Sequence, residues 1–207
     1  NSKKIIDNSP KIYNSMVILD NKLNLISEYN KINLVPFGEF LPFEKFFKKL
    51  GLKKISYGYE SFSAGNDRQL ISLDDKNFNF IPLICYEIIY SGKINLKSDK
   101  TNFIINISED GWFGNSIGPY QHFSHSIFRA IEEGKNIIRV SNNGISAYID
   151  SNGLIIDKLE TTNKGVIEIN NYKNSKMTFF SKFGNKIFFY FILFYISLLF
   201  FNYKRER

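Results

Sequence analysis

Cys85 is the only cysteine in the chain, and its context is that of a nucleophile. It follows the apolar run Phe-Ile-Pro-Leu-Ile at residues 80–84, and Tyr86 and Glu87 come directly after it. This pattern is typical of a nucleophile elbow, in which a buried strand ends, the chain turns sharply and a reactive side chain is left at the sheet edge. A lone cysteine is as often a small buried hydrophobic residue, so this context alone leaves both interpretations open.

Two other segments also place polar residues just after apolar runs. In the first, Lys31 precedes the sequence Val-Pro-Phe-Gly-Glu, whose proline and glycine stiffen the turn that presents Glu39. In the second, Glu109 and the only tryptophan, Trp112, stand in a glycine-containing loop that suggests the wall of a pocket. The simpler alternatives are a solvated lysine for Lys31 and a charge at a helix start for Glu39.

A third polar pair, Asn142 and Asn143, precedes a glycine after another apolar run. By default this sequence is a turn. The alternative is that Asn142 and Asn143 line the same pocket as Trp112. A thiolate, the reactive form of cysteine, is favoured by a nearby cation and by backbone N–H groups at a helix start. The same N–H groups are suited to hold an oxyanion.

The elements that must position these residues alternate between strands and helices, which predicts an α/β fold with a mixed sheet. Residues 13–19 and 23–29 form a hairpin pattern, and residues 1–12 are expected to be loose. Proline in the first turn and Gly134 beyond the end frame a helix over residues 119–133. The remaining predicted elements are strands at 70–73, 78–84, 103–107, 137–140, 146–149 and 166–169, a helix at 43–50, a loop at 53–67, and turns at 74–77 and 152–153.

Composition excludes several classes of function. The net charge is +7, but the lysines are scattered and form no basic stripe with aromatic residues, so no nucleic-acid partner is expected. One cysteine permits no intrachain disulfide and no multi-cysteine zinc site. His122 and His125, three residues apart, are expected to be polar helix residues near a surface or pocket, and no metal is predicted.

The C-terminal part of the chain has the pattern of a membrane span. Residues 187–203 carry no charge. A helix over them would measure about 25 Å, slightly less than a hydrocarbon core of about 30 Å. Phe179 and Phe180 are expected to extend the apolar face, giving a span region over residues 179–203. The basic tail at 204–207 predicts a cytoplasmic C-terminus, with residues 1 to about 180 on the other side. A buried core helix is the alternative.

The chain begins with asparagine and has no signal peptide pattern. A large domain that precedes its span needs another segment to lead it out of the cytoplasm. We therefore expect the sequence to be the C-terminal part of a longer membrane protein.

Five motifs in order carry a specific resemblance: Val-Pro-Phe-Gly-Glu, Cys-Tyr-Glu, Asp-Gly-Trp-Phe-Gly-Asn-Ser-Ile-Gly-Pro-Tyr-Gln-His, Arg-Ala-Ile-Glu and Asn-Asn-Gly-Ile-Ser-Ala. Over about residues 12–170 they resemble the carbon–nitrogen hydrolase (nitrilase) superfamily, and within it the membrane-bound acyltransferases of bacterial lipoprotein maturation. The resemblance implies an α-β-β-α sandwich with mixed sheets over residues 13–176, followed by one transmembrane helix.

The family uses a Glu–Lys–Cys triad, and the resemblance assigns Cys85 as nucleophile and Lys31 as the triad lysine. Glu39, Tyr86 and Glu87 match residues that support the site, and the backbone N–H of Tyr86 would help Lys31 to hold the oxyanion. The family's general-base glutamate is expected upstream of residue 1. Glu109 departs from the family pattern, which more often has Asn there.

The implied reaction moves an acyl chain from a phospholipid, through a thioester, to the N-terminal amine of a diacylglyceryl-cysteine lipoprotein. No cofactor is implied, and a monomer in the bacterial inner membrane, with a periplasmic catalytic domain, is expected. Two alternatives stay open: an amidase that hydrolyses a small C–N bond with the same triad, and a non-catalytic domain tethered to the membrane.

Overall fold

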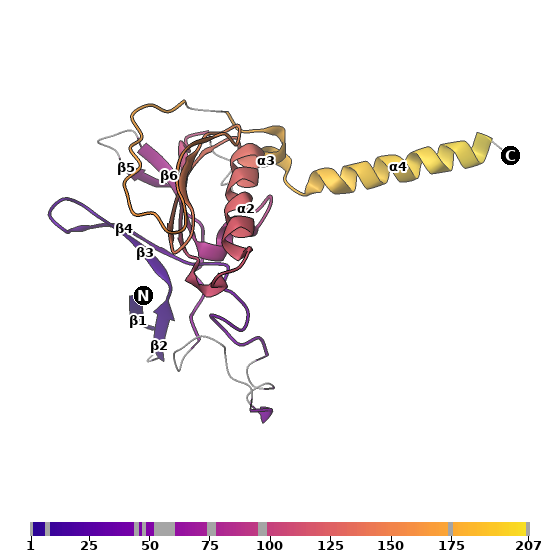
Figure 1. Cartoon of the computed structure of the whole chain (residues 1–207). Helices are drawn as coiled ribbons and strands as arrows, with labels where there is room; N and C mark the ends of the chain where they lie inside the picture. The colour runs from indigo at the N-terminus through magenta and orange to yellow at the C-terminus, as the bar shows by residue number, and fades with distance from the viewer. Residues whose placement is uncertain are drawn as a thin grey trace.

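The computed structural model describes residues 2–6, 9–43, 46, 49–51, 61–73, 78–94, 99–173 and 176–205. Strands and helices alternate along the chain, as the sequence predicts (Figure 1). The elements are β1 (Ser2–Ile6), β2 (Ser9–Tyr13), β3 (Ser15–Leu19), β4 (Leu25–Asn30), β5 (Ile71–Leu73), β6 (Phe78–Ile84), β7 (Phe103–Glu109), α2 (Gly118–Glu133), β8 (Asn136–Asn142), β9 (Ser146–Ile149), β10 (Ile155–Leu159), α3 (Phe179–Phe183) and α4 (Lys186–Arg205).

A six-stranded mixed sheet in the order β10-β9-β8-β7-β6-β5 forms the centre of the domain. Its middle strands β6, β7 and β8 are parallel, whereas β5, β9 and β10 pair antiparallel to their neighbours. The α/β class with a mixed sheet is therefore confirmed. Because β6, β7 and β8 run in the same direction, their carboxyl ends meet at one edge of the sheet, where open α/β sheets bind their ligands.

The two faces of the sheet bury different apolar clusters, because successive strand residues point to opposite sides. In β6, Ile81 and Leu83 pack on the side of α2, while Phe80 and Ile84 pack on the opposite side. The antiparallel hairpin β3–β4 covers that second side through Met16 and Tyr29. Figure 1 shows the resulting layers, with α2 on one side of the sheet and the hairpin on the other. The described chain thus supplies a helix layer, the sheet and a β layer.

Helix α2 begins and ends where its sequence signals place it. Pro119 lies in the first turn, where its missing N–H costs no hydrogen bond. Gly134 ends the helix in the left-handed conformation at φ 62°, and its N–H donates to the carbonyl of Ala130, an arrangement common at helix C-termini. The buried face of α2 includes Phe123 and Ala130, which pack on the sheet. The predicted helix over residues 119–133 is confirmed.

Three expectations differ from the structure. Residues 2–6 and 9–13 pair as antiparallel strands where a loose segment was expected. Residues 166–169 form no strand; Ile167 and Ile169 pack against the hairpin-side cluster, so their alternation reflects burial without strand pairing. Strand β10, which follows the predicted turn at 152–153 and pairs with β9, was not predicted; Gly153 in this turn has a φ of 84°.

Other predicted segments fall partly outside the described residues. The predicted turn at 74–77 is outside them, as are residues 44–45 and 47–48 of the predicted helix and 53–60 of the predicted loop. Residues 61–67 have no regular secondary structure, as predicted for that loop.

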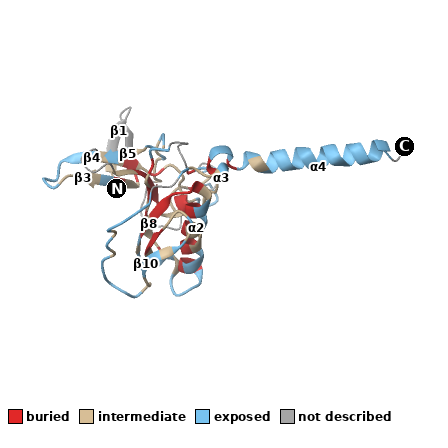
Figure 2. Cartoon of the chain, turned by 90° about the horizontal axis from the view of Figure 1, so that it is seen from above, coloured by how far each residue is buried: buried red, intermediate tan, exposed pale blue. Residues whose placement is uncertain are grey.

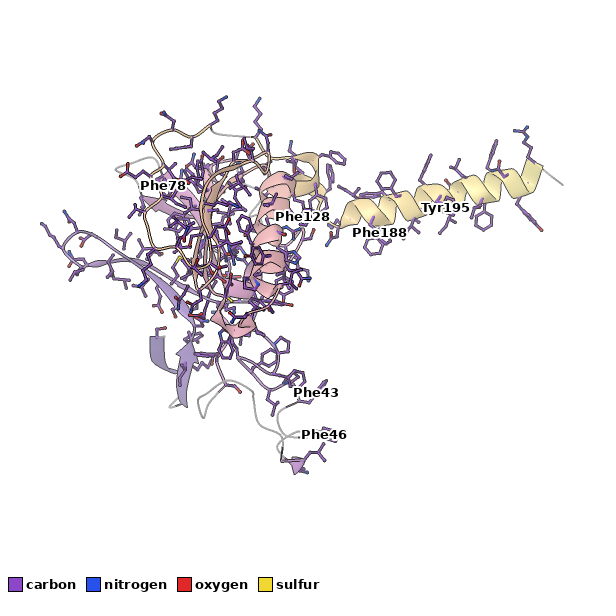
Figure 3. All side chains as sticks on the ribbon, viewed as in Figure 1. Phe43, Phe46, Phe78, Phe128, Phe188 and Tyr195 are labelled. Carbon is purple, nitrogen blue, oxygen red and sulfur yellow. The ribbon has the colours of Figure 1, made fainter. Side chains whose placement is uncertain are left out.

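The C-terminal apolar segment is divided into two helices at Gly184, whose φ of 56° and ψ of −147° are incompatible with a continuous helix. Phe179 and Phe180 therefore belong to the short helix α3 and do not extend α4, contrary to expectation. Helix α4 leaves the domain, and none of its residues is buried (Figure 2). Phe188 and Tyr195 project freely from it in Figure 3.

Helix α4 is long and apolar enough to cross a membrane, and it is the one such helix among the described residues. It contains 20 residues. A helix of this length measures about 30 Å, which matches the thickness of a hydrocarbon core. Its exposed side chains are mostly apolar, so its surface suits lipid better than water.

Candidate active site

Cys85 stands at the point where β6 gives way to a 3₁₀ helix, Cys85–Ile89. Its backbone adopts a left-handed conformation with φ 51°, which is uncommon for a residue with a Cβ atom and costs free energy. Strain of this kind persists only where the surroundings hold it, and it is common at active sites. The geometry is that of an elbow, as the sequence context predicted, and it leaves the thiol half-buried.

Lys31 follows β4 and is buried, with 1% of its side chain exposed. Its backbone is held on both sides, because its N–H donates to the carbonyl of Asn14 and its own carbonyl accepts from Gly65. Glycine is required at position 65, since a Cβ atom there would lie 2.2 Å from the carbonyl oxygen of Asn30. These two backbone hydrogen bonds fix the position of the Lys31 backbone independently of the contacts made by its ammonium group.

The ammonium of Lys31 pairs with Glu39, at 2.8 Å from Nζ to Oε2. Glu39 accepts two further hydrogen bonds, one from the side chain of Asn14 and one from the backbone N–H of Val35. These neutral donors hold the carboxylate in place, and the carboxylate in turn compensates the buried positive charge. The two residues that the sequence placed eight positions apart are therefore direct partners.

Glu87 is fully buried and joins the lysine segment to the elbow. Its carboxylate accepts hydrogen bonds from the hydroxyl of Tyr29 (2.8 Å), from the N–H groups of Ile32 and Asn33, and from the N–H of Ile84 (2.8 Å). Arg68 approaches it at 3.4 Å. These donors come from the end of β4, the segment before β5 and the end of β6. Glu87 therefore fixes the position of the Lys31 segment relative to Cys85.

Tyr29 is held by the same carboxylate. Its burial and the charge of Glu87 raise the pKa of the Tyr29 hydroxyl well above its ordinary value. Both effects disfavour the ionised form, so the hydroxyl remains a donor.

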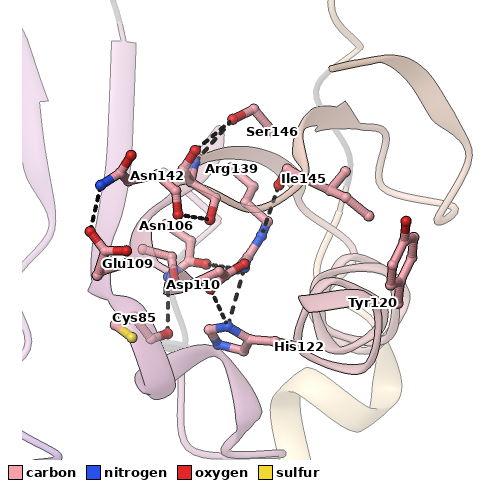
Figure 4. A network of polar contacts seen from close by, with 12 residues as sticks. Cys85, Asn106, Glu109, Asp110, Tyr120, His122, Arg139, Asn142, Ile145 and Ser146 are labelled. Carbon is pink, nitrogen blue, oxygen red and sulfur yellow. Dashed lines mark hydrogen bonds and ion pairs between the residues drawn. The ribbon is translucent and has the colours of Figure 1, made fainter. Parts of the chain in front are cut away.

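Behind the elbow lies a second buried polar network, drawn in Figure 4. The side-chain amide of Asn106 donates to the carbonyl of Cys85 (3.3 Å), and its oxygen accepts from Arg139. The same guanidinium donates to Asp110 (2.7 Å), whose other oxygen lies 2.8 Å from Nδ1 of His122. The network links β7, β8 and α2 to the backbone of the cysteine.

The charges of this network compensate one another away from water. Burial by itself would raise the pKa of Asp110, but the hydrogen bond with His122 and the positive charge of Arg139 hold it well below its ordinary value. Burial lowers the pKa of Arg139, an effect that Asp110 opposes. The carboxylate of Asp110 is therefore ionised throughout the physiological range.

A cavity of about 740 Å³ opens at this edge of the sheet, a size typical of ligand pockets. Its wall brings together side chains from the three segments singled out in the sequence and is mostly apolar. The lining residues used below are Lys31, Glu39, Cys85, Tyr86, Glu109 and Trp112.

The remaining predicted site residues have different positions. Trp112 is two-thirds exposed at the cavity wall, and Asn142 reaches the wall through its bond to Glu109. Asn143, at φ 55°, forms a turn, the default interpretation of its sequence. His122 is a buried network residue, and His125 is a half-buried helix residue beside Phe128.

Sequence reasoning did not assign the roles of Asn106, Asp110 and Arg139. A signal was present, since Asn106 and Arg139 each interrupt an otherwise apolar strand, and a polar residue at a buried position needs a partner. The register of β7 and β8 places these two residues directly opposite each other.

Comparison with known proteins shows the family to which the chain belongs. A family model described as carbon–nitrogen hydrolase matches residues 2–170. A protein of Brucella melitensis biotype 1 named apolipoprotein N-acyltransferase is 40% identical over 159 residues, which cover 77% of this chain and 30% of that protein. A protein of Rickettsia typhi with the same name is 40% identical over 176 residues, covering 84% of this chain and 35% of that protein.

The chain thus spans about a third of the length of the curated relatives that it matches. Among solved structures, the NitN amidase from Nesterenkonia has 14% identity and a TM-score of 0.47, with 71% of this chain and 52% of that chain covered.

Proposed function

Since this chain belongs to the carbon–nitrogen hydrolase family, we propose that it carries the thioester-forming site of an apolipoprotein N-acyltransferase. Cys85 is the proposed nucleophile and Lys31 the proposed oxyanion-stabilising cation. The observation that supports this most directly is the cavity in which the strained Cys85 and the Lys31–Glu39 pair share one wall.

In the proposed first step, the Cys85 thiolate attacks an ester carbonyl of a phospholipid. A C–S bond forms, the ester C–O bond breaks, and the lysophospholipid leaves as an alcohol with the proton released by the thiol. The developing oxyanion is stabilised by the Lys31 ammonium and the backbone N–H of Tyr86. In the second step, the α-amine of a diacylglyceryl-cysteine attacks the thioester, a C–N bond forms, and the C–S bond breaks to restore the cysteine.

The proton of the thiol requires a base. Glu39 and Glu87 have other partners, and Glu109 stands where the family pattern more often has Asn, so it does not match the family's base. Glu87 is buried among its donors, and Glu39 is paired with Lys31. We propose that the general base is a glutamate outside residues 1–207, as the family resemblance implies. The curated relatives extend well beyond the matched region, which leaves room for such a residue.

Both proposed substrates are lipids, and α4 gives the domain a means of staying at a membrane. We propose the bacterial inner membrane, with the domain on its periplasmic side, because Lys204 and Arg205 at the end of α4 favour a cytoplasmic C-terminus. A fluorescent reporter that matures only in the cytoplasm, fused to the C-terminus, should be bright. A dark but stably expressed fusion would reverse the orientation.

The activity is tested by incubating the complete gene product with phospholipid and measuring its intact mass. An acyl adduct on Cys85, transferred to a diacylglyceryl peptide on its addition, is the expected result. No adduct in the wild-type protein would overturn the proposal. An adduct released only to water would instead indicate an amidase-type hydrolase.

A further inference from the structure

Two carboxylates line the cavity among the described residues, and their surroundings differ. Glu39 is ion-paired with Lys31. Glu109 has neutral partners, with Oε1 accepting from the N–H of Gly111 (2.7 Å) and Oε2 from the side-chain amide of Asn142 (2.6 Å). In the part of the chain that the structure describes, Glu109 forms no ion pair. No described residue therefore compensates the negative charge of Glu109 at the cavity wall.

The fold holds Glu109 next to the elbow. Strands β6 and β7 are parallel neighbours with Ile84 opposite Ile107, so Cys85 and Glu109 follow these positions at the same edge of the sheet. Ile107 and Glu109 point to the same face, and both line the cavity. Figure 4 shows Cys85 and Glu109 on the same side of the buried network, with Glu109 bonded to Asn142.

The carboxylate is also fixed in orientation. A Cβ atom at position 111 would lie 2.5 Å from Oε1 of Glu109, so glycine is what allows the backbone N–H to approach this oxygen. With Asn142 holding the other oxygen, the group is ordered before any ligand arrives. Each carboxylate oxygen still has a lone pair for a further donor.

We propose that Glu109 binds the ammonium group of the acyl acceptor, an inference that rests on the proposed function. An α-amino group has a pKa of about 8, so the acceptor arrives largely as an ammonium ion. A charge-assisted hydrogen bond to an ordered carboxylate would place this nitrogen beside the thioester on Cys85. The role belongs to the second step, because the ammonium nitrogen becomes the nucleophile only there.

The proton balance of the second step is consistent with this position. The ammonium must lose one proton before its nitrogen can attack, and the Glu109 carboxylate accepts it and passes it to water. The neutral amine then attacks the thioester carbonyl, the C–S bond breaks, and the second proton goes to the departing Cys85 thiolate. The products are the amide and the free thiol.

The test uses the complete gene product with phosphatidylglycerol as donor, a lipid without an ammonium group. Acyl-enzyme formation is followed by intact mass, and transfer is then started with a diacylglyceryl-cysteine peptide. In Glu109→Gln, Cys85 should be acylated at the wild-type rate, while transfer to the peptide should fall by about 10-fold or more. Glu109→Asp, which keeps the charge, should recover part of the transfer rate.

Two controls separate binding of the acceptor from a general disturbance. Hydroxylamine, a nucleophile that is uncharged at neutral pH, should release the acyl chain equally fast from wild type and Glu109→Gln. Glu160→Gln makes the same chemical change at a partly exposed ion pair with Lys158 and should match wild type in every step.

Unchanged transfer to the peptide in Glu109→Gln would overturn the inference. So would equal slowing with hydroxylamine and with the peptide, or loss of acylation itself. A wild-type protein that forms no acyl thioester would overturn the proposed function and this inference together, and that outcome is visible before any acceptor is added.

Discussion

On the buried side of Cys85, the carboxylates of Glu87 and Asp110 are enclosed by donors, and their partners come from elements far apart in the chain. On the cavity side, Lys31, Glu39 and Glu109 line the space that a ligand would enter. The two sides use the same residue types for different purposes. Buried charges with complete partners fix the strained backbone, whereas charges at the cavity wall remain available for a substrate.

This difference leads to separable consequences of mutation. Removing one partner of a buried charge leaves the other desolvated and unpaired, which lowers the free energy of unfolding strongly. Removing a cavity-side group is expected to affect the chemistry first. The following predictions test the comparison, beginning with the largest expected effect.

Cys85→Ala in the complete gene product should abolish acyl-enzyme formation while the protein stays folded. Alanine removes the only thiol of the chain, and it retains the Cβ atom at the left-handed position. Intact mass after incubation with phospholipid measures the adduct, and thermal unfolding checks the fold. An acyl adduct that persists in this variant would place the nucleophile elsewhere.

Lys31→Met should reduce the rate of Cys85 acylation by about 10²-fold or more, the usual effect of removing an oxyanion donor. The thiol and the cavity remain, but the positive charge at the wall is lost. The rate of adduct formation measures the effect. Lys158→Met, at a partly exposed ion pair, is the matched control and should acylate normally. Equal rates in both variants would contradict a catalytic role for Lys31.

Glu87→Gln should lower the free energy of unfolding by about 3 kcal/mol. The amide has one acceptor oxygen in place of two, so its NH₂ group faces a backbone or hydroxyl donor and leaves that donor unsatisfied. Denaturant unfolding measures the change. Glu109→Gln, on the cavity side, should change the stability by much less, and similar losses in both variants would remove the distinction between the two sides.

The stability that Asp110 contributes should depend on pH. Its folded-state pKa lies below its ordinary value of 3.8. The contribution is therefore fully present above about pH 4 and is lost as the pH falls toward the folded-state pKa. Asp110→Asn should be less stable than wild type at neutral pH, and the difference should shrink as the pH falls below about 4. Unfolding curves across this pH range measure the difference in stability between the two proteins. A difference that does not change with pH would show that folding does not favour the ionised form of Asp110.

The sequence alone determined the local parts of this protein. Strand β6 followed by Cys85, the caps of α2 and the apolar composition of α4 are readable because each depends on residues close together in the chain. The predicted strand at 166–169 was wrong, because alternation of apolar residues shows which side chains are buried and not which backbone segments pair.

Only the tertiary structure decided how the buried charges are satisfied. Glu87 receives donors from three segments, and Arg139 connects Asn106 with Asp110 across neighbouring strands. Desolvation makes such partners necessary, but many polar residues in the chain could supply them, so the pairing depends on register and packing. For the same reason the sequence placed Glu109 in a loop expected at the wall of a pocket, but its hydrogen bonds with Gly111 and Asn142 were visible only in the fold.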